Sequence, residues 1–150
     1  MALDNLKIDS HKLMYHVGRV DQWLKGKPIC PIYVEIGPSG SCNHRCIFCA
    51  FDYIGYKKVF LDTKILKKRL SEMAGLGVKS ILYSGEGEPL LHQDMPEIIL
   101  HTKRAGIDAA LATNGVLLNR GISEKILGAL TWLKISVNAG TKHTHSRIHC

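Results

Sequence analysis

The stretch IYVEIGPSGSCNHRCIFC, residues 32–49, joins a strand pattern to a cluster of cysteines. Its first five residues are rich in β-branched and aromatic side chains, which is typical of a β-strand. The Gly/Pro/Ser segment at residues 37–41 ends that strand. Three thiols follow with the spacing C-x3-C-x2-C, at Cys42, Cys46 and Cys49. The sequence therefore predicts a strand whose carboxyl end carries a loop of candidate metal ligands.

Further strand patterns alternate with helix patterns along the rest of the chain. The strands are predicted at residues 78–83, 107–112 and 132–137, and the helices at residues 62–74, 94–105 and 123–130. Asp62, Asp94 and Ser123 are the predicted helix N-caps. Crossovers of this length require parallel strands with right-handed connections. The predicted fold class is therefore α/β, with ligands bound beyond the carboxyl ends of the strands.

A separate amphipathic helix is predicted ahead of this alternation, at residues 10–25, with Asp9 or Ser10 as its cap. One face of it carries Leu13, Val17, Val20 and Leu24. We therefore divide the chain into an N-terminal helical extension, residues 1–29, and a main domain, residues 30–150.

Composition and charge narrow the class of protein. Apolar residues make up 45% of the 150 residues, which is ordinary for a globular protein. No apolar run has the length of a membrane span and the N-terminus has no secretory signal pattern, so a cytoplasmic location is expected. The net charge of +7 favours anionic partners, such as nucleic acid, a phosphorylated substrate or an acidic electron donor. The basic residues are dispersed and no nucleic-acid motif is present, so nucleic acid is not indicated.

The cysteine spacing indicates an iron–sulfur cluster. Five cysteines, three of them within eight residues, do not resemble a disulfide framework. Thiolates are the usual protein ligands of iron–sulfur clusters, and a short loop can curl around one corner of a cubane. Three thiolates for four irons leave one iron with an open position, as in catalytic rather than structural metal sites.

Other kinds of metal site remain open at this point. Zinc would need a fourth ligand, for which Cys30 or His44 is available, but no second C-x2-C pair is present. A ferredoxin would need a fourth cysteine, and Cys30 and Cys150 do not have a familiar ferredoxin spacing. The histidine-rich end, residues 143–149, fits no ligand spacing that we can assign, so we expect no metal role there.

The C-x3-C-x-aromatic-C motif, with Phe48 at the aromatic position, resembles the signature of the radical S-adenosylmethionine (SAM) superfamily. The resemblance implies a [4Fe–4S] cluster on the three cysteines, with SAM chelating the open iron. It further implies reductive cleavage of SAM to a 5′-deoxyadenosyl radical that abstracts hydrogen from a substrate. It also implies a partial (β/α)6 TIM-like barrel, of which this chain would supply the first four strands after an N-terminal helix.

Other residues enter through the same resemblance. The segment Gly85-Glu86-Gly87-Glu88-Pro89 is similar to the family's Gly-Gly-Glu-Pro motif, which binds the amino group of SAM, although Glu86 replaces the first glycine. The turn that begins Thr113-Asn114 resembles a common family turn, and Ser136 and Asn138 hold positions where family members contact SAM.

Because the pattern ends after the fourth strand, we expect the chain to be part of a longer enzyme that could be inactive alone. We expect a flavodoxin or ferredoxin as electron donor. The substrate cannot be read from the sequence. The alternative function is a non-catalytic iron–sulfur or zinc-binding module.

Overall fold

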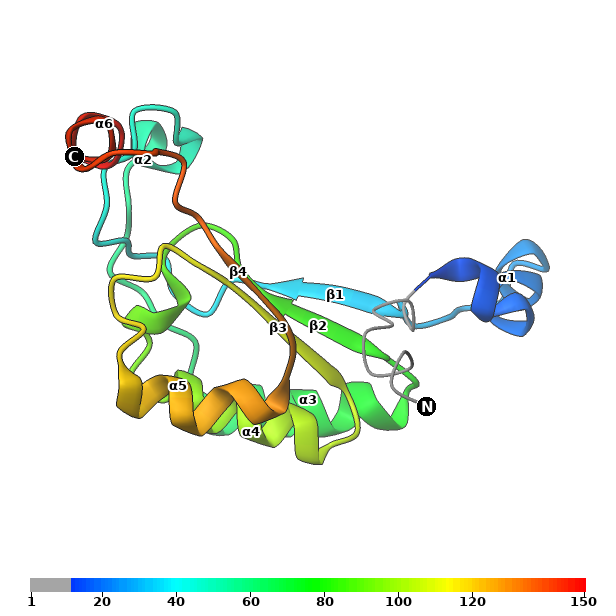
Figure 1. The fold of residues 1–150 in the computed structure, drawn as a ribbon. Helices are drawn as coiled ribbons and strands as arrows, with labels where there is room; N and C mark the ends of the chain where they lie inside the picture. Colours follow the sequence, from blue (N-terminus) through cyan, green and yellow to red (C-terminus); the bar gives the residue numbers. More distant parts are fainter. Residues whose placement is uncertain (1–11) are drawn as a thin grey trace.

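The computed structural model describes residues 12–150 as an α/β unit with a protruding N-terminal helix (Figure 1). The strands are β1 (Tyr33–Ile36), β2 (Ser80–Tyr83), β3 (Asp108–Thr113) and β4 (Leu130–Ile135). The helices are α1 (Val17–Leu24), α2 (Ala50–Ile54), α3 (Thr63–Gly75), α4 (Met95–Arg104), α5 (Arg120–Ile126) and α6 (Lys142–His149). Short 3-10 turns occur at Leu13–Tyr15, Pro89–Leu91 and Leu127–Ala129.

All four strands are parallel and lie in the order β1-β2-β3-β4. The predicted α/β class is therefore confirmed. Each predicted strand is present, with ends that differ from the prediction by one or two residues. Because all four strands run in the same direction, their carboxyl ends lie along one edge of the sheet, next to the loops that follow them.

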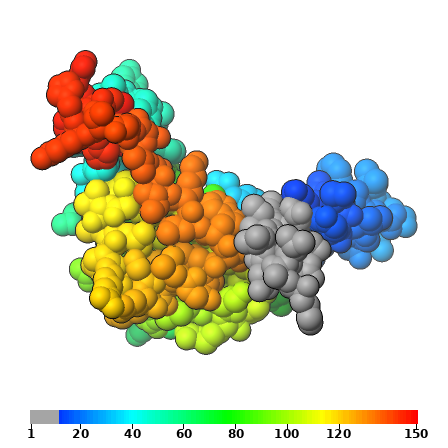
Figure 2. Space-filling model, in the orientation of Figure 1, coloured from blue at the N-terminus to red at the C-terminus, as the bar shows by residue number. Residues whose placement is uncertain are grey.

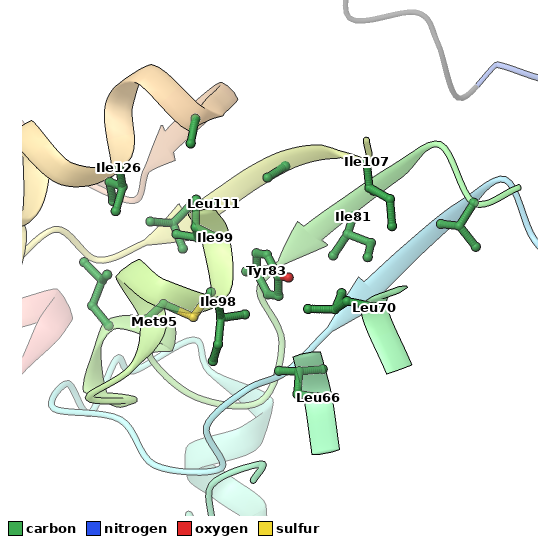
Figure 3. Close-up of a cluster of buried hydrophobic side chains, with 14 residues drawn as sticks. Leu66, Leu70, Ile81, Tyr83, Met95, Ile98, Ile99, Ile107, Leu111 and Ile126 are labelled. Atoms are coloured by element: carbon green, nitrogen blue, oxygen red, sulfur yellow. The ribbon is translucent and has the colours of Figure 1, made fainter. Parts of the chain in front are cut away.

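The hydrophobic core lies between the sheet and helices α3, α4 and α5, which cover the same face (Figure 1). The register aligns Ile36, Tyr83, Leu111 and Leu133 in one row across this face. Leu66 and Leu70 of α3 and Met95, Ile98 and Ile99 of α4 pack against the sheet (Figure 3). Thr102 Oγ1 donates to the Ile98 carbonyl (2.8 Å), so it must accept from the buried Tyr83 hydroxyl (2.5 Å).

The opposite face of the sheet carries the alternate residues of each strand. The row that crosses it at mid-height is Glu35, Leu82, Ala110 and Trp132. Glu35 is exposed and accepts a hydrogen bond from the Tyr33 hydroxyl at 2.6 Å. This face therefore mixes charged, aromatic and small side chains, whereas the helix-covered face is mostly apolar.

The helix caps confirm one prediction and correct two. Asp62 caps α3, because its carboxylate accepts from the Ile65 N–H at 2.8 Å. Asp94 occupies the N-cap position of α4 but makes no capping bond, since its carboxylate accepts instead from the Thr63 hydroxyl at 2.6 Å. The prediction that Ser123 caps α5 is wrong: the helix begins at Arg120, and Asn119 accepts from the Ile122 N–H at 3.0 Å.

The N-terminal helix is shorter than predicted. Residues 13–15 form a 3-10 turn and the α-helix begins at Val17, while the predicted caps Asp9 and Ser10 lie outside the described residues. Leu13, Val17 and Leu24 are 64–73% exposed, because α1 projects beyond the amino ends of the strands (Figures 1 and 2). Arg19 ties it to the main unit by donating to the carbonyls of Cys30 and Leu76.

Within residues 12–150, no helix combines the length and the apolar character that crossing a bilayer requires.

The correction at α5 can be tested with one pair of variants. Replacing Asn119 by Ala removes the capping acceptor and should lower the free energy of unfolding by about 1 kcal/mol. Ser123→Ala, inside the same helix, should change it by less than about 0.5 kcal/mol. Urea denaturation of both variants measures the difference, and a larger loss for Ser123→Ala would contradict the assignment.

Candidate active site

All the residues predicted to bind metal or cofactor line one cavity of about 180 Å³ at the carboxyl ends of the strands. From the cysteine loop come Cys42, Cys46, Phe48 and Cys49; from the loop after β2 come Gly85, Glu86, Gly87, Glu88 and Pro89; and from β3, β4 and their ends come Thr113, Asn114, Ser136 and Asn138. The topology thus brings together four segments that are far apart in the sequence.

The cysteine loop leaves the end of β1, and its two ends are hydrogen-bonded to each other. Backbone bonds join its two ends: the Gly40 N–H donates to the Val59 carbonyl and the Lys57 N–H to the Gly40 carbonyl, both at 2.9 Å. A bridge between Ser39 and Phe60 extends this pairing. The chain between these ends includes the three cysteines and the short helix α2, so the thiols are carried by a loop with fixed ends.

Each thiol has a different polar neighbour. Cys42 Sγ accepts from the His44 N–H at 3.4 Å, Cys46 Sγ lies 3.1 Å from His149 Nδ1, and Cys49 Sγ lies 3.2 Å from the Tyr56 hydroxyl. Burial raises the pKa of Cys46, and the nearby Cys42 and Cys49 thiols raise it further. Burial also acts to raise the pKa of Cys49, but hydrogen bonds from Tyr56 and from backbone N–H groups outweigh it and lower that pKa.

The Glu88 carboxylate connects the strand-end loops. Its side chain is 3% exposed, and Oε1 accepts from the Thr113 hydroxyl at 2.6 Å and the Leu90 N–H at 3.0 Å. Oε2 accepts from the Asn114 N–H at 2.8 Å. The Glu88 N–H in turn donates to the Ser41 carbonyl at 2.8 Å. One residue therefore fixes the β2 loop against both the β3 turn and the start of the cysteine loop.

Gly87 lies where no side chain can fit. A Cβ at this position would meet the carbonyl oxygens of Ser41 and Ser39 at 2.2 and 2.6 Å and the Ser41 nitrogen at 2.7 Å. The backbone of the β2 loop therefore packs directly on the backbone that leads into Cys42. Gly85 adds a second close approach: its φ is +117°, and a Cβ at this position would lie 3.2 Å from the Cα of Gly37.

The remaining predicted residues sit around the rim. Glu86 and Asn138 are exposed, and Asn138 has a φ of +51°, in the left-handed region that Asn tolerates. Ser136 continues the sheet by donating its N–H to the Thr113 carbonyl at 2.9 Å. Asn114 Nδ2 donates to Asn43 at 2.7 Å, which links the β3 turn to the cysteine loop. Phe48 is 61% exposed.

Helix α6 is the part of the site that sequence reasoning missed. Its last turn docks on the cysteine loop: the Ile47 N–H donates to the Ile148 carbonyl at 3.0 Å, and the Arg45 N–H reaches the His149 carbonyl at 3.3 Å (Figures 1 and 2). These bonds satisfy carbonyls that a helix end leaves open. His149 is buried and lines the cavity, a position that the spacing of this histidine-rich end did not indicate.

The cysteines considered as a fourth ligand lie elsewhere. Cys30 precedes β1 and so lies toward the amino end of the sheet, next to Arg19. Cys150 is exposed, and its thiol lies 3.5 Å from the Arg147 carbonyl. Neither lines the cavity that holds the other three thiols.

Comparison with known proteins identifies the class that this fold and site define. The sequence pattern of the radical SAM superfamily matches residues 36–149, which include strands β2, β3 and β4 and all three cavity cysteines. This chain belongs to the radical SAM superfamily.

Individual proteins that are similar to this chain are consistent with the family match. A GTP 3′,8-cyclase of Chlorobaculum tepidum is 35% identical over 108 residues, which cover 71% of this chain and 32% of that protein. An Fe-coproporphyrin III synthase of Methanosarcina barkeri is 26% identical over 149 residues, 96% of this chain and 33% of that protein. The chain thus spans about a third of the length of the curated relatives it matches. Streptococcus suis SuiB bound to S-adenosylmethionine shares the fold, with a TM-score of 0.61 at 22% identity over 83% of this chain and 29% of that one.

The close approach at Gly87 makes a direct prediction. Gly87→Ala should destabilise the fold by about 1–3 kcal/mol, because the methyl group must displace backbone atoms. Gly128→Ala is the matched control, since a Cβ there meets nothing within 4 Å. Thermal unfolding followed by circular dichroism compares the two, and equal melting temperatures would contradict the packing described.

The hydrogen bonds of Glu88 lead to a second stability prediction. Glu88→Gln replaces one acceptor oxygen by an NH2 group that faces a donor, so unfolding should become easier by about 1–3 kcal/mol. The exposed Glu86→Gln should stay within about 0.5 kcal/mol of the parent. Urea denaturation of both variants tests this, and an unaffected Glu88→Gln would show that the buried network contributes little.

Proposed function

We propose that this chain is the N-terminal part of the core of a radical SAM enzyme, in which Cys42, Cys46 and Cys49 hold a [4Fe–4S] cluster. The observation that supports this most strongly is the position of the three thiols, which line one cavity together with the loops after β2, β3 and β4. Membership of the superfamily makes the cluster the expected occupant of these thiols.

The donor set fits a cubane with one open iron. Three cysteine thiols line the cavity, and Cys30 and Cys150, the candidates for a fourth thiolate, do not. Each of the three thiolates would bind a different iron. When bound, the reduced cluster supplies the electron that splits SAM into methionine and a 5′-deoxyadenosyl radical, which takes a hydrogen atom from the substrate.

The strand-end loops are suited to holding SAM beside the cluster. Its ammonium group needs acceptors, and Glu88 Oε2 accepts one hydrogen bond within the described chain, so one of its lone pairs stays available. Because Thr113 and the backbone fix this carboxylate, it would meet the ligand without reorganising. The remaining predicted contacts to SAM are Phe48, Gly85, Glu86, Gly87, Pro89, Asn114, Ser136 and Asn138.

The proposal also covers the domain division, the location in the cell and the electron donor. We place residues 1–29 outside the core domain and the enzyme in the cytoplasm. A net charge of +7 would favour docking of an acidic electron donor such as flavodoxin or ferredoxin. The substrate stays open, because the names of the relatives cover different reactions.

Anaerobic reconstitution of the full chain with iron and sulfide tests the proposal. The parent should take up about four irons per chain and cleave SAM to 5′-deoxyadenosine when reduced. Cys42→Ala, Cys46→Ala and Cys49→Ala should each abolish cleavage and lose most of the iron. Iron content and the electron paramagnetic resonance signal of the reduced cluster report binding, and chromatography reports cleavage.

Cys30→Ala and Cys150→Ala serve as matched controls, because both remove a thiol that does not line the cavity. They should keep the iron content of the parent. Iron uptake that survives all three loop substitutions, or that requires Cys30 or Cys150, would rule out the assignment.

A further inference from the structure

A second, smaller group of ligand atoms overlaps the cysteine loop. Among the described residues, His44, Cys46 and His149 form the group of three whose ligand atoms all lie within 4.8 Å of one another. Cys46 Sγ and His149 Nδ1 are 3.1 Å apart. The three loop thiols do not form so compact a group, which suits a cluster that has a separate iron for each of them. The compact group suits a single ion.

His149 is prepared as a metal ligand. Its Nε2 lies 2.9 Å from the Val137 carbonyl, which can only accept, so Nε2 carries the hydrogen. In the neutral ring Nδ1 then keeps a free lone pair, and this is the nitrogen that faces Cys46. A ligating histidine whose other N–H donates to a backbone carbonyl is the arrangement that orients imidazole in metal sites.

His44 supplies the third position. Its Nδ1 is buried and has no hydrogen-bond partner among residues 12–150, a state that costs free energy unless the atom is satisfied by a ligand. Its ring lies 5.1 Å from that of His149, centroid to centroid. An unsatisfied buried nitrogen next to a thiol and an oriented imidazole is a second indication that this corner binds an ion.

The chemistry of the group selects a borderline-soft divalent ion. Thiolate and imidazole are both usual zinc ligands, and a site with three protein ligands leaves the fourth tetrahedral position to water. Bond lengths of about 2.3 Å to sulfur and 2.0–2.1 Å to nitrogen place such ligand atoms about 3.5 Å apart. The Cys46–His149 separation of 3.1 Å is close to that value, and the ligand atom of His44 lies within 4.8 Å of both.

We propose that the cluster-free protein binds one zinc-like divalent ion through His44, Cys46 and His149, and that this ion and the [4Fe–4S] cluster exclude each other because both need Cys46. The ion would also hold α6 on the cysteine loop, since His149 ends that helix. This inference rests on the proposed function only for the identity of the competing occupant.

Titration of the metal-free full chain with Zn²⁺ or Co²⁺ tests the proposal. Competition with a chromogenic chelator should give one ion per chain, and Co²⁺ should show a thiolate charge-transfer band with intense tetrahedral d–d bands. His149→Ala and His44→Ala should each weaken Zn²⁺ binding about tenfold or more.

Cys42→Ala separates this site from the cluster. It should keep Zn²⁺ affinity while losing the cluster, whereas Cys46→Ala should lose both. His143→Ala is the control on α6, because its side chain is exposed and outside the group. Zn²⁺ binding that needs Cys42 as much as His149, or that survives both histidine substitutions, would overturn the proposal and leave the cluster assignment untouched.

Discussion

The arrangement of the site depends on one buried carboxylate. Among residues 12–150 no cationic side chain forms an ion pair with Glu88; backbone N–H groups and the Thr113 hydroxyl satisfy its carboxylate instead. A buried charge of this kind is tolerable only while every donor stays in place. The loops after β1, β2 and β3 are therefore coupled, since a shift of one would leave the charge poorly solvated. The close packing of Gly87 on Ser39 and Ser41 adds a steric limit to the same junction.

The conformation of the cysteine loop is fixed mainly by contacts with other parts of the chain. Pairing of Gly40 with Lys57 and Val59 fixes its ends, but its middle is held by α6, about a hundred residues further along the chain. The contact between Cys46 and His149 spans 103 positions. The geometry of the ligands is consequently a tertiary property, although the ligands themselves are adjacent in sequence.

Most of the fold was predictable because its signals are local. Asp62 precedes an apolar pattern of helical spacing, and the strands are short runs bounded by turn residues. The cap of α5 was misplaced because Asn119 and Ser123 are both good capping residues, and only tertiary packing decides between them. The three cysteines stood out by spacing alone. His149 did not, because its role depends on how a helix folds back onto the loop, and no local pattern encodes that contact.

The two faces of the sheet differ in what their side chains contribute to folding. Ile36, Tyr83, Leu111 and Leu133 point toward the helices, so changes there would damage packing. Glu35, Leu82, Ala110 and Trp132 point the other way and do not belong to the core cluster under the helices. A substitution at the exposed part of the second row, such as Glu35, therefore alters the surface of the sheet without loosening the helix-covered core.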